Sequence, residues 1–257
     1  MIDLVLHGAA GRMGRAVALA AGASEDARVV AFVDQSANLL ADGGIWTADL
    51  ASALAPGRVV IEFSGPSGTR QAAELCAARG VPLVSGSTGL GEEAEAALRA
   101  AATKVAVFRA SNFSVGVAVL RAALAAALAA APRSWDIEIV ERHHRMKQDS
   151  PSGTALTLAD DALAARELTR AALTHGRQGA VGARPAAEIG MHAVRGGTWV
   201  GDHQVLLAGE GEWVELRHVA QDRAAFAHGA LAAARFLSTA APGMYNMQDL
   251  IRGPGRT

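Results

Sequence analysis

The chain has 257 residues, a mass of 26.3 kDa and a formal net charge of -1. Hydrophobic residues make up 51% of it and charged residues 19%, which excludes disorder and allows one large domain or two ordinary ones. The balanced charge and the 4% aromatic content argue against nucleic-acid and anionic-membrane partners, and the single cysteine, Cys76, excludes an intrachain disulfide and a thiolate metal cluster.

No targeting segment is expected at the N-terminus, because Met1–Gly8 is short and lacks the basic start of a signal peptide. The longest apolar stretch, Val115–Pro132, is built largely from Ala and is interrupted by Arg121. This composition predicts a core-facing or interface helix and not a membrane span. We therefore expect a cytoplasmic protein with no membrane partner.

The stretch up to Ser114 alternates short β-rich runs with Ala-rich helical runs. The predicted strands are Ile2–Leu6, Val29–Val33, Val59–Phe63, Leu83–Ser85 and Val105–Phe108, and the predicted helices are Arg12–Ala21, Gln71–Arg79 and Glu92–Thr103. This alternation predicts an α/β domain over residues 1–114, with a parallel sheet covered on both faces.

After Ser114 the predicted strands and helices no longer alternate regularly, and their order predicts an α+β domain over residues 115–222. A long helix ends at Pro132, and a second helix opens at Pro151 and runs to about Leu168. The predicted strands are Asp136–Val140, Ile189–Arg195, His203–Ala208 and Trp213–Val219, with a charged stretch at Glu141–Asp149 and a long loop at Thr174–Arg184. A last helix, Ala224–Leu237, is free to dock on either domain.

Three glycines, Gly8, Gly11 and Gly14, lie between the first predicted strand and the first predicted helix. Without side chains there, a pyrophosphate can approach the backbone and the positive end of the helix. Asp34 ends the second predicted strand, where a carboxylate accepts hydrogen bonds from an adenosine ribose. A purely structural turn is the alternative, but strand, helix and acid together favour a dinucleotide site.

The neighbouring residues bear on which dinucleotide binds. Arg12 either pairs with a phosphate or is a solvated first-turn residue. Gln35 stands where Lys or Arg would attract a 2′-phosphate, so we expect NADH to be favoured over NADPH. The turns Ser64–Thr69 and Gly86–Gly89 also follow strands, and either contact the nicotinamide half or are ordinary turns.

The stretch Glu141–Thr154 contains His143, His144 and Lys147 just before a Ser-Gly-Thr helix start. A helix N-terminus suits a carboxylate, a lysine adds a full charge, and a histidine can supply a proton. This combination indicates a small anionic substrate that is protonated during reaction. The alternative is a solvated basic loop before a well-capped helix.

Other chemistries fit the sequence poorly. His143 and His144 are adjacent and point in different directions, so we expect no metal site. The only tyrosine, Tyr245, has Asp249 four residues on, so no Tyr-x-x-x-Lys dyad exists. Cys76 lies inside a helical run and is predicted to be a small core residue.

With these motifs in hand, the chain resembles the 4-hydroxy-tetrahydrodipicolinate reductase family, also called dihydrodipicolinate reductases. The most specific match is Glu141-x-His143-His144-x-x-Lys147-x-Asp149-x-Pro151-Ser152-Gly153-Thr154. Supporting pieces are Gly8-x-x-Gly11-Arg12-Met13-Gly14, Ser111–Val117, Arg195-x-Gly197, Gly201-x-His203 and Arg223-x-x-Phe226-Ala227-x-Gly229-Ala230.

The resemblance implies a Rossmann domain, to which residues 223–257 return, and an α+β domain with an open mixed sheet that forms a homotetramer. It implies NADH- or NADPH-dependent reduction of a cyclic unsaturated dicarboxylate to tetrahydrodipicolinate in lysine and diaminopimelate biosynthesis. His143 matches the proton donor, Lys147 a catalytic and substrate-binding residue, and His144, Ser152, Gly153 and Thr154 substrate-binding positions. The cofactor positions are Gly8, Gly11, Arg12, Met13, Gly14, Asp34, Phe63, Gly86, Ser87, Thr88, Ala110, Ser111, Asn112, Phe113 and Arg223.

Some residues depart from the family pattern. The usual Asp-Phe-Thr after the third strand is Glu62-Phe63-Ser64, and the usual Gly-Thr-Thr-Gly turn has Ser87. Arg109 stands where an apolar residue is expected, and the segment between Asp34 and Val59 is short. Two rival functions are a reductase of another imine or enamine dicarboxylate, and a nucleotide-binding regulator without catalysis. The regulator has no evident use for His143 and Lys147 together.

Overall fold

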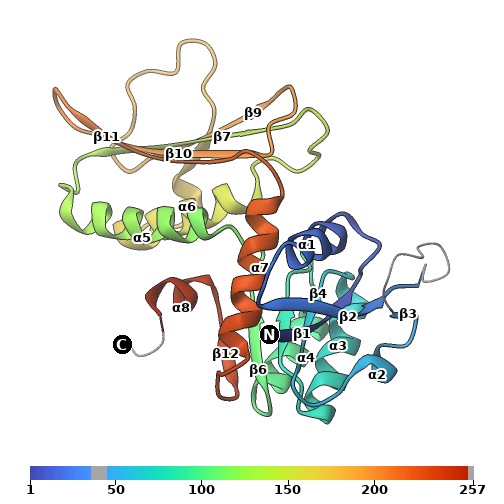
Figure 1. Ribbon diagram of the computed structural model, residues 1–257. Coiled ribbons are helices and arrows are strands. Elements are labelled where there is room, and N and C mark those ends of the chain that lie inside the picture. The colour runs from blue at the N-terminus through green and yellow to red at the C-terminus, as the bar shows by residue number, and fades with distance from the viewer. Residues whose placement is uncertain (36–44, 254–257) are drawn as a thin grey trace. The chain divides into compact units, whose positions relative to one another are not determined.

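The structure is a computed structural model that describes residues 1–35 and 45–253. The chain divides into two compact units, each with its own sheet (Figure 1). The first consists of residues 1–115 and the segment from Arg223 onward, and the second is Gly116–Asp222.

The first unit is built on a seven-stranded sheet of order β12-β6-β5-β4-β1-β2-β3. Every neighbouring pair in it is parallel. Its strands are β1 (Ile2–His7), β2 (Ala27–Val33), β3 (Ile45–Thr47), β4 (Arg58–Glu62), β5 (Leu83–Ser85), β6 (Ala106–Arg109) and β12 (Gly243–Tyr245). Runs of consecutive buried residues in β1 and β4 are typical of a sheet covered on both faces.

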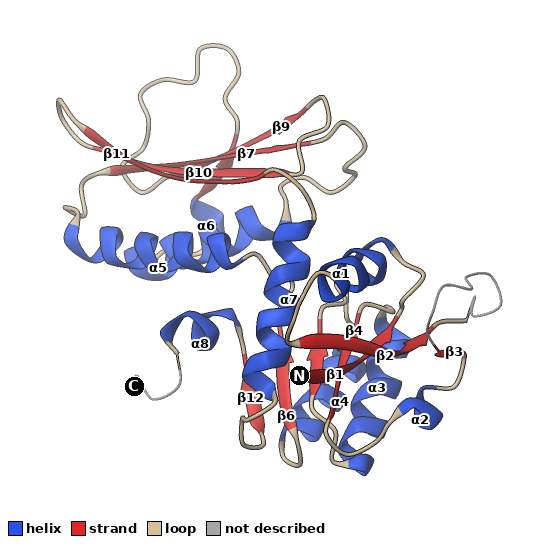
Figure 2. Cartoon of the chain, in the orientation of Figure 1, coloured by secondary structure: helices blue, strands red, loops and turns tan. Residues whose placement is uncertain are grey.

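The helices of this unit are α1 (Arg12–Gly22), α2 (Leu50–Ala53), α3 (Pro66–Arg79), α4 (Glu92–Ala102), α7 (Ala224–Leu237) and α8 (Met247–Arg252). α1 packs against α7 and α3 packs against α4, and each pair also contacts strands of the sheet (Figure 2). Because α7 and β12 come from the end of the chain, the C-terminal segment completes the first unit. Cys76 is fully buried in its core, as predicted.

The second unit holds a five-stranded mixed sheet of order β11-β10-β7-β9-β8. Its strands are β7 (Asp136–His143), β8 (Leu173–His175), β9 (Ile189–Arg195), β10 (Gly201–Ala208) and β11 (Trp213–Ala220). β10 is antiparallel to both of its neighbours, and β7, β9 and β8 are parallel. Every second residue of β7 is buried, because α5 (Val115–Ala130) and α6 (Gly153–Arg166) pack on one face only.

The predicted fold class, a Rossmann-type parallel sheet with a second mixed sheet, is confirmed. The prediction that the strand starting at Asp136 ends at Val140 is wrong, because β7 continues to His143 by pairing with β10 and β9. The predicted loop over Thr174–Arg184 is confirmed from Gly176 onward, but its first two residues belong to Leu173–His175, which adds to the sheet edge beside β9. The short elements β3, α2, β12 and α8, and the 3-10 turn Arg170–Ala172, were not predicted.

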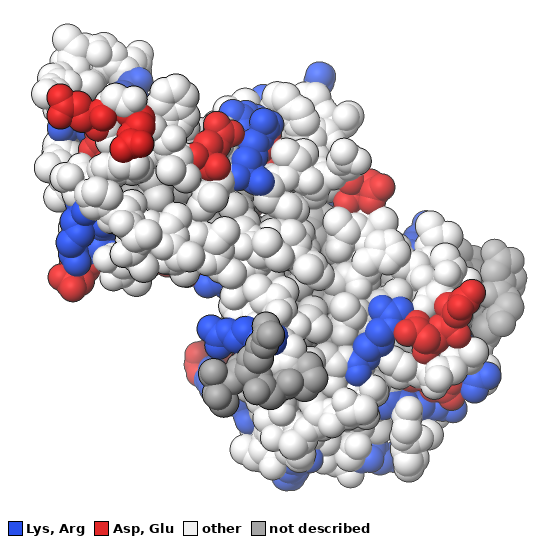
Figure 3. All heavy atoms as spheres, turned by 60° about the vertical axis from the view of Figure 1, so that its left-hand side comes forward, with Lys and Arg blue, Asp and Glu red and all other residues white. Residues whose placement is uncertain are grey.

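The surface carries charges of both signs. On the face shown in Figure 3, Lys and Arg side chains alternate with Asp and Glu, and no broad field of one sign covers it. Ion pairs such as Arg235–Asp26, at 2.7 Å, are part of this pattern. Among the helices within residues 1–35 and 45–253, none is long and apolar enough to cross a membrane.

Candidate active site

The glycine turn after β1 leaves room for glycine alone at two positions. Gly8 has φ +80, and a Cβ there would lie 2.6 Å from the carbonyl oxygen of Phe63. A Cβ on Gly14 would lie 2.6 Å from Cα of Ala9. Gly11 caps α1 with no side-chain hydrogen bond, so the first N–H groups of the helix face outward for an anion. Arg12 begins the helix and is exposed, and Met13 is half-buried.

Asp34 ties the end of β2 to this turn. Its carboxylate accepts a hydrogen bond of 3.0 Å from the N–H of Ala10. The side chain is half-buried beside the phosphate turn, the position from which an acid reaches an adenosine ribose. Gln35 is exposed, and the segment that follows it lies outside the described residues.

Glu62, the last residue of β4, is fully buried and organises the turns of the same sheet edge. Its carboxylate accepts hydrogen bonds from the N–H and hydroxyl of Ser64 (2.5 and 2.8 Å) and from the hydroxyls of Thr69 (2.9 Å), Ser85 (3.0 Å) and Ser87 (2.5 Å). Ser87 in turn accepts from the N–H of Gly65 at 2.8 Å. One carboxylate therefore organises both segments. The turn predicted over Ser64–Thr69 is shorter than expected, because α3 begins at Pro66.

An aromatic cluster lies beside those turns. The ring of Phe63 is 5.7 Å from that of Phe113 in an edge contact, and Phe113 is 5.9 Å from Phe108. Phe63 lies so close over Gly86 that a side chain on Gly86 would collide with its ring. Ala110 is buried next to the cluster, and the Asn112 side chain accepts from the N–H of Ser114 at 2.8 Å.

The remaining cofactor candidates are exposed. Thr88, Ser111 and Arg223 all lie on the surface of the first unit, and Arg223 occupies the N-cap position of α7. Arg109, for which the sequence offered no reason, is explained by an ion pair with Glu95 of α4 at 3.0 Å and a hydrogen bond to its neighbour's carbonyl oxygen.

In the second unit, Glu141 and His143 lie two residues apart on β7 and therefore on the same face. Nδ1 of His143 lies 2.6 Å from a carboxylate oxygen of the fully buried Glu141. Arg195 of β9 binds both oxygens of the same carboxylate at 2.7 Å. Burial raises the pKa of Glu141, but hydrogen bonds from His143, Arg195 and the N–H of Ser152 outweigh it and lower the pKa to about 2.

This arrangement fixes which ring nitrogen of His143 exchanges protons. The Glu141 carboxylate beside Nδ1 accepts the Nδ1–H and fixes the orientation of the ring, so Nε2 is the nitrogen left for a ligand. A Cβ on Gly201 would lie 3.3 Å from Nε2, so glycine keeps that nitrogen uncrowded.

His203 contacts the residue that caps the start of α6. The buried Ser152 accepts from the N–H of Ala155 at 3.2 Å as the N-cap, and its Oγ lies 3.0 Å from Nε2 of His203. Burial, together with the charge of His143, lowers the pKa of His203 to about 4, so this ring is neutral near pH 7. The Ser152 hydroxyl is thus fully engaged, whereas a Cβ on Gly153 would meet nothing within 4 Å. Thr154, half-buried, follows in the first turn of α6.

The basic residues after β7 lie in a turn anchored to the rest of this unit. The N–H of His144 donates to the carbonyl oxygen of Trp199 at 2.8 Å. Nζ of Lys147 binds both carboxylate oxygens of Asp149 at 2.8 and 2.9 Å, and this ion pair lowers the pKa of Asp149. Arg195 also donates to the Asp149 carbonyl oxygen at 2.8 Å, so one guanidinium joins Glu141 to the lysine turn.

The structure therefore groups the predicted residues in two sets. The cofactor candidates lie in the first unit, where all but Arg223 follow β1, β2, β4, β5 or β6. His143, His144, Lys147 and the start of α6 lie together in the second. The roles of Glu62, Glu141, Arg195 and His203 were not predicted from the sequence. The last three lay within the quoted family motifs, but only the register of β7, β9 and β10 shows that they meet.

The glycine turn, the following helix and Asp34 place the first unit among the dinucleotide-binding domains of pyridine-nucleotide oxidoreductases. Family models bear this out over almost the whole chain: "Dihydrodipicolinate reductase, N-terminus" matches residues 2–113 and "Dihydrodipicolinate reductase, C-terminus" matches residues 116–251. The chain belongs to the dihydrodipicolinate reductase family.

Relatives and solved structures agree with this assignment. The chain is 43% identical to the 4-hydroxy-tetrahydrodipicolinate reductase of Chromobacterium violaceum, over 97% of this chain and 98% of that one. It is 44% identical to the enzyme of the same name from Myxococcus xanthus, over 98% of each chain. A dipicolinate-bound dihydrodipicolinate reductase from Paenisporosarcina sp. TG-14 has a TM-score of 0.77 and 25% identity, and covers 96% of this chain and 97% of its own.

Proposed function

We propose that this chain reduces 4-hydroxy-tetrahydrodipicolinate to tetrahydrodipicolinate with a reduced pyridine nucleotide. The observation that carries the proposal is the buried Glu141 carboxylate, which orients His143 and at the same time anchors the N-cap of α6. A proton donor and an anion site are thereby fixed to one another. Family membership and the names of the relatives support the same reaction.

The chemistry assigns a separate task to each group. Loss of water from the hydroxylated ring would give a conjugated C=C–C=N system, and a reduced nicotinamide bound at the glycine turn would supply the hydride for its terminal carbon. The electron pair displaced onto the ring would then be quenched by a proton from Nε2 of His143, whose ring Glu141 orients. The oxidised nucleotide, water and tetrahydrodipicolinate are the products.

The substrate carboxylates need positive partners. The N–H groups at Gly153 and Thr154, at the open start of α6, would bind one of them with help from the helix dipole. Lys147 would release Asp149 and bind a substrate carboxylate in its place. His144 would donate a hydrogen bond to the substrate. Ser152 would act indirectly, by capping the start of α6, because its hydroxyl is buried.

The cofactor would bind at the glycine turn, with its ribose on Asp34. A carboxylate repels a 2′-phosphate and Gln35 adds no positive charge, so NADH should bind at least as tightly as NADPH. Titration of both nucleotides against the wild type and Gln35→Arg tests this. The variant should shift the preference toward NADPH, and a strong NADPH preference in the wild type would contradict the proposal.

We also propose a cytoplasmic homotetramer with no nucleic-acid or membrane partner. The sheet face opposite α5 and α6 exposes Trp213 and Val219, at 67% and 51% of their surface. The same face carries the polar side chains of Arg142, Gln204 and Arg217, and exposed apolar groups set among polar ones fit an interface between copies of the chain. Light scattering should give four subunits, and a clean monomer at micromolar concentration would refute it.

The reaction itself is tested by following NADH oxidation with freshly prepared 4-hydroxy-tetrahydrodipicolinate. A matched panel of cyclic imines with one carboxylate or none serves as the control. Turnover confined to the dicarboxylate supports the proposal. Faster turnover of another imine would favour a different reductase, and nucleotide binding without any turnover would favour the regulator.

A further inference from the structure

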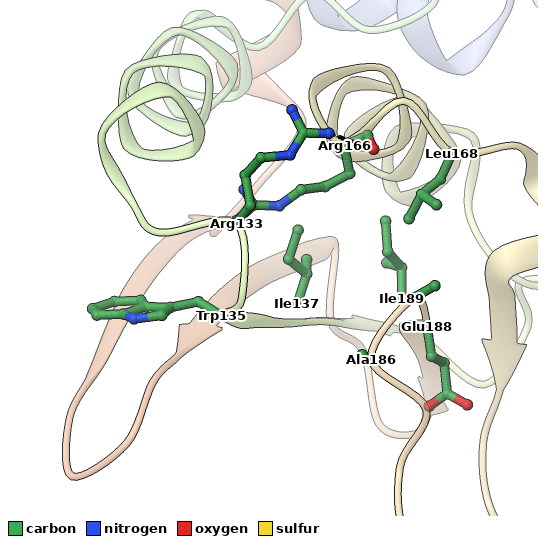
Figure 4. A pocket seen from close by; sticks show the side chains of 9 residues that line it. Arg133, Trp135, Ile137, Arg166, Leu168, Ala186, Glu188 and Ile189 are labelled. Atoms are coloured by element: carbon green, nitrogen blue, oxygen red, sulfur yellow. Dashed lines mark hydrogen bonds between the residues drawn. The ribbon is translucent and has the colours of Figure 1, made fainter.

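A cavity of about 220 Å³ lies in the second unit away from the residues described above. Its lining comes from the connection between α5 and β7, the start of β7, the end of α6 and the segment before β9 (Figure 4). Ile137 lines it, whereas His143 ends the same strand six residues later, about 20 Å away along an extended strand. The cavity is therefore separate from the proposed proton donor.

Apolar side chains form one part of the lining. Ile137, Leu168 and Ile189 contribute aliphatic surface, and Ala186 and Ala187 leave space beside them. Trp135 also belongs to the lining, although Figure 4 shows its ring turned away from these side chains. Figure 4 shows Ile137 and Ile189 rising from their strands below the two arginines of the cavity. Cavities that enclose drug-sized ligands measure about 300–1,000 Å³, so this one suits a single ring or a short branched chain.

Arg166, the last residue of α6, is the polar group that sets this cavity apart. Only 9% of it is exposed, and its Nε has no hydrogen-bond partner. One terminal nitrogen donates to the carbonyl oxygen of Pro132 at 3.2 Å. In the part of the chain that the structure describes, no carboxylate lies within ion-pair distance of its guanidinium.

The neighbouring charges do not compensate Arg166. Arg133, also in the lining, adds positive charge and pairs with the exposed Glu167 at 3.3 Å. Glu188 is bound by Arg177 and lies 3.9 Å from Arg184. Burial and the nearby Arg133 lower the pKa of Arg166, as expected for a cation that lacks an anion.

A structural role explains only part of this arrangement. A cation at the end of a helix interacts favourably with the helix dipole, and the bond to Pro132 ties α6 to the end of α5. Neither effect requires a guanidinium to be buried with an unpaired N–H beside an apolar cavity, because buried donors are nearly always satisfied.

We propose that this cavity binds a small monocarboxylate with a compact apolar body, either aryl or branched aliphatic. The carboxylate would accept from a terminal N–H of the Arg166 guanidinium and neutralise its charge, and the apolar body would fill the space between Ile137, Leu168 and Ile189. The single negative charge of the ligand matches the uncompensated Arg166, and its apolar body matches the aliphatic side chains of the lining.

The test uses 4-fluorobenzoate as the probe and follows its ¹⁹F NMR signal with the full-length protein. The probe should broaden and shift saturably, and excess pyridine-2,6-dicarboxylate, an analogue of the proposed substrate, should leave that binding unchanged. 4-Fluorobenzamide, which has the same shape and no charge, should bind at least about tenfold more weakly. Displacement by the dicarboxylate, or equal binding of the amide, would overturn the proposal.

Three variants locate the site. Arg166→Met should weaken 4-fluorobenzoate by at least about tenfold, and Arg166→Lys should restore part of the loss. Ala187→Trp, at an exposed position of the lining, should fill the cavity and leave the charge of Arg166 unchanged. Arg99→Met removes another last-turn arginine, in α4, and should bind like the wild type. Wild-type binding by either Arg166→Met or Ala187→Trp would overturn the proposal, and the second remains decisive if the first fails to fold.

Discussion

Each unit of the chain buries one glutamate completely, and the two carboxylates have different partners. Glu62, under the nucleotide turns, accepts only from hydroxyls and a backbone N–H. Glu141, under the proposed proton donor, is bound by Arg195 and His143 as well as by the N–H of Ser152. The first carboxylate shapes backbone turns, whereas the second also orients the proposed proton donor.

The difference follows from what each site must bind. A pyrophosphate is bound mainly by backbone N–H groups, so its site needs turns of fixed shape. A substrate that takes up a proton needs a donor whose tautomer and charge are held, which requires an ionised partner in a low-dielectric setting. Variants of the two units should therefore fail in different ways.

The largest effect is expected at the proton donor and its cationic neighbour. His143→Ala and Lys147→Ala should each lower kcat by about 10²–10⁴-fold, because a general acid or an electrostatic partner is lost. The Kd for NADH should barely change in either, since neither residue belongs to the nucleotide unit. Lys147→Ala should also weaken pyridine-2,6-dicarboxylate more than His143→Ala does. The control is His175→Ala, which changes an exposed histidine of the same unit. Near-normal turnover in both His143→Ala and Lys147→Ala would show that the reaction is not catalysed at this site.

Glu141 comes next. Glu141→Ala leaves Arg195 and His143 without their anion, so we expect about 3–5 kcal/mol less stability in urea unfolding. Glu141→Gln keeps the volume but not the charge, and should lower kcat by about 10²-fold with a smaller loss of stability. If Glu141→Gln turned over like the wild type, the carboxylate would have no part in orienting the donor.

Glu62 should show the opposite pattern. Glu62→Gln presents an amide to groups that all donate, so we expect the Kd for NADH to rise by about tenfold while the Kd for pyridine-2,6-dicarboxylate stays constant. Glu62→Asp, with the charge kept, should lose less. Equal weakening of both ligands would mean that the residue supports the fold in general and not the nucleotide turns.

The smallest effect concerns pH. The pKa of His203 is lowered from 6.5 to about 4 by burial, so the folded state favours the neutral ring. Its contribution to stability is fully present above pH 6.5 and is lost as the pH falls toward 4, with a slope of at most about 1.4 kcal/mol per pH unit. The free energy of unfolding, measured between pH 7 and 4.5, should fall less steeply in His203→Gln than in the wild type. Parallel slopes would show that the buried ring is not the titrating group.

The two units also differ in how much of each site could be predicted from the sequence. The nucleotide turn was predictable because Gly8, Gly11, Gly14 and Asp34 are close in the chain and each has a local physical reason. The role of Glu62 was not predicted because its partners come from the ends of β4 and β5 and from α3, and hydroxyl residues in turns have an ordinary structural reading.

In the second unit, residue types predicted the donor and the helix start but not their support. Arg195 lies 54 positions from Glu141, and His203 lies 51 from Ser152. Only strand register brings such residues together, and single-sequence patterns do not fix register across a mixed sheet. The early end assigned to β7 has the same origin, because Arg142 and His143 look like loop residues until Asp202 and Arg195 pair with them.

The transfer of hydride to the dicarboxylate is tested most directly with a reduced nicotinamide that carries deuterium at the transferred position. The wild type and 4-hydroxy-tetrahydrodipicolinate would be incubated with labelled NADH, and the product analysed by mass spectrometry. The account predicts one deuterium in tetrahydrodipicolinate for each nucleotide oxidised. Nucleotide oxidation that leaves the product unlabelled, or no oxidation while both ligands bind, would contradict it.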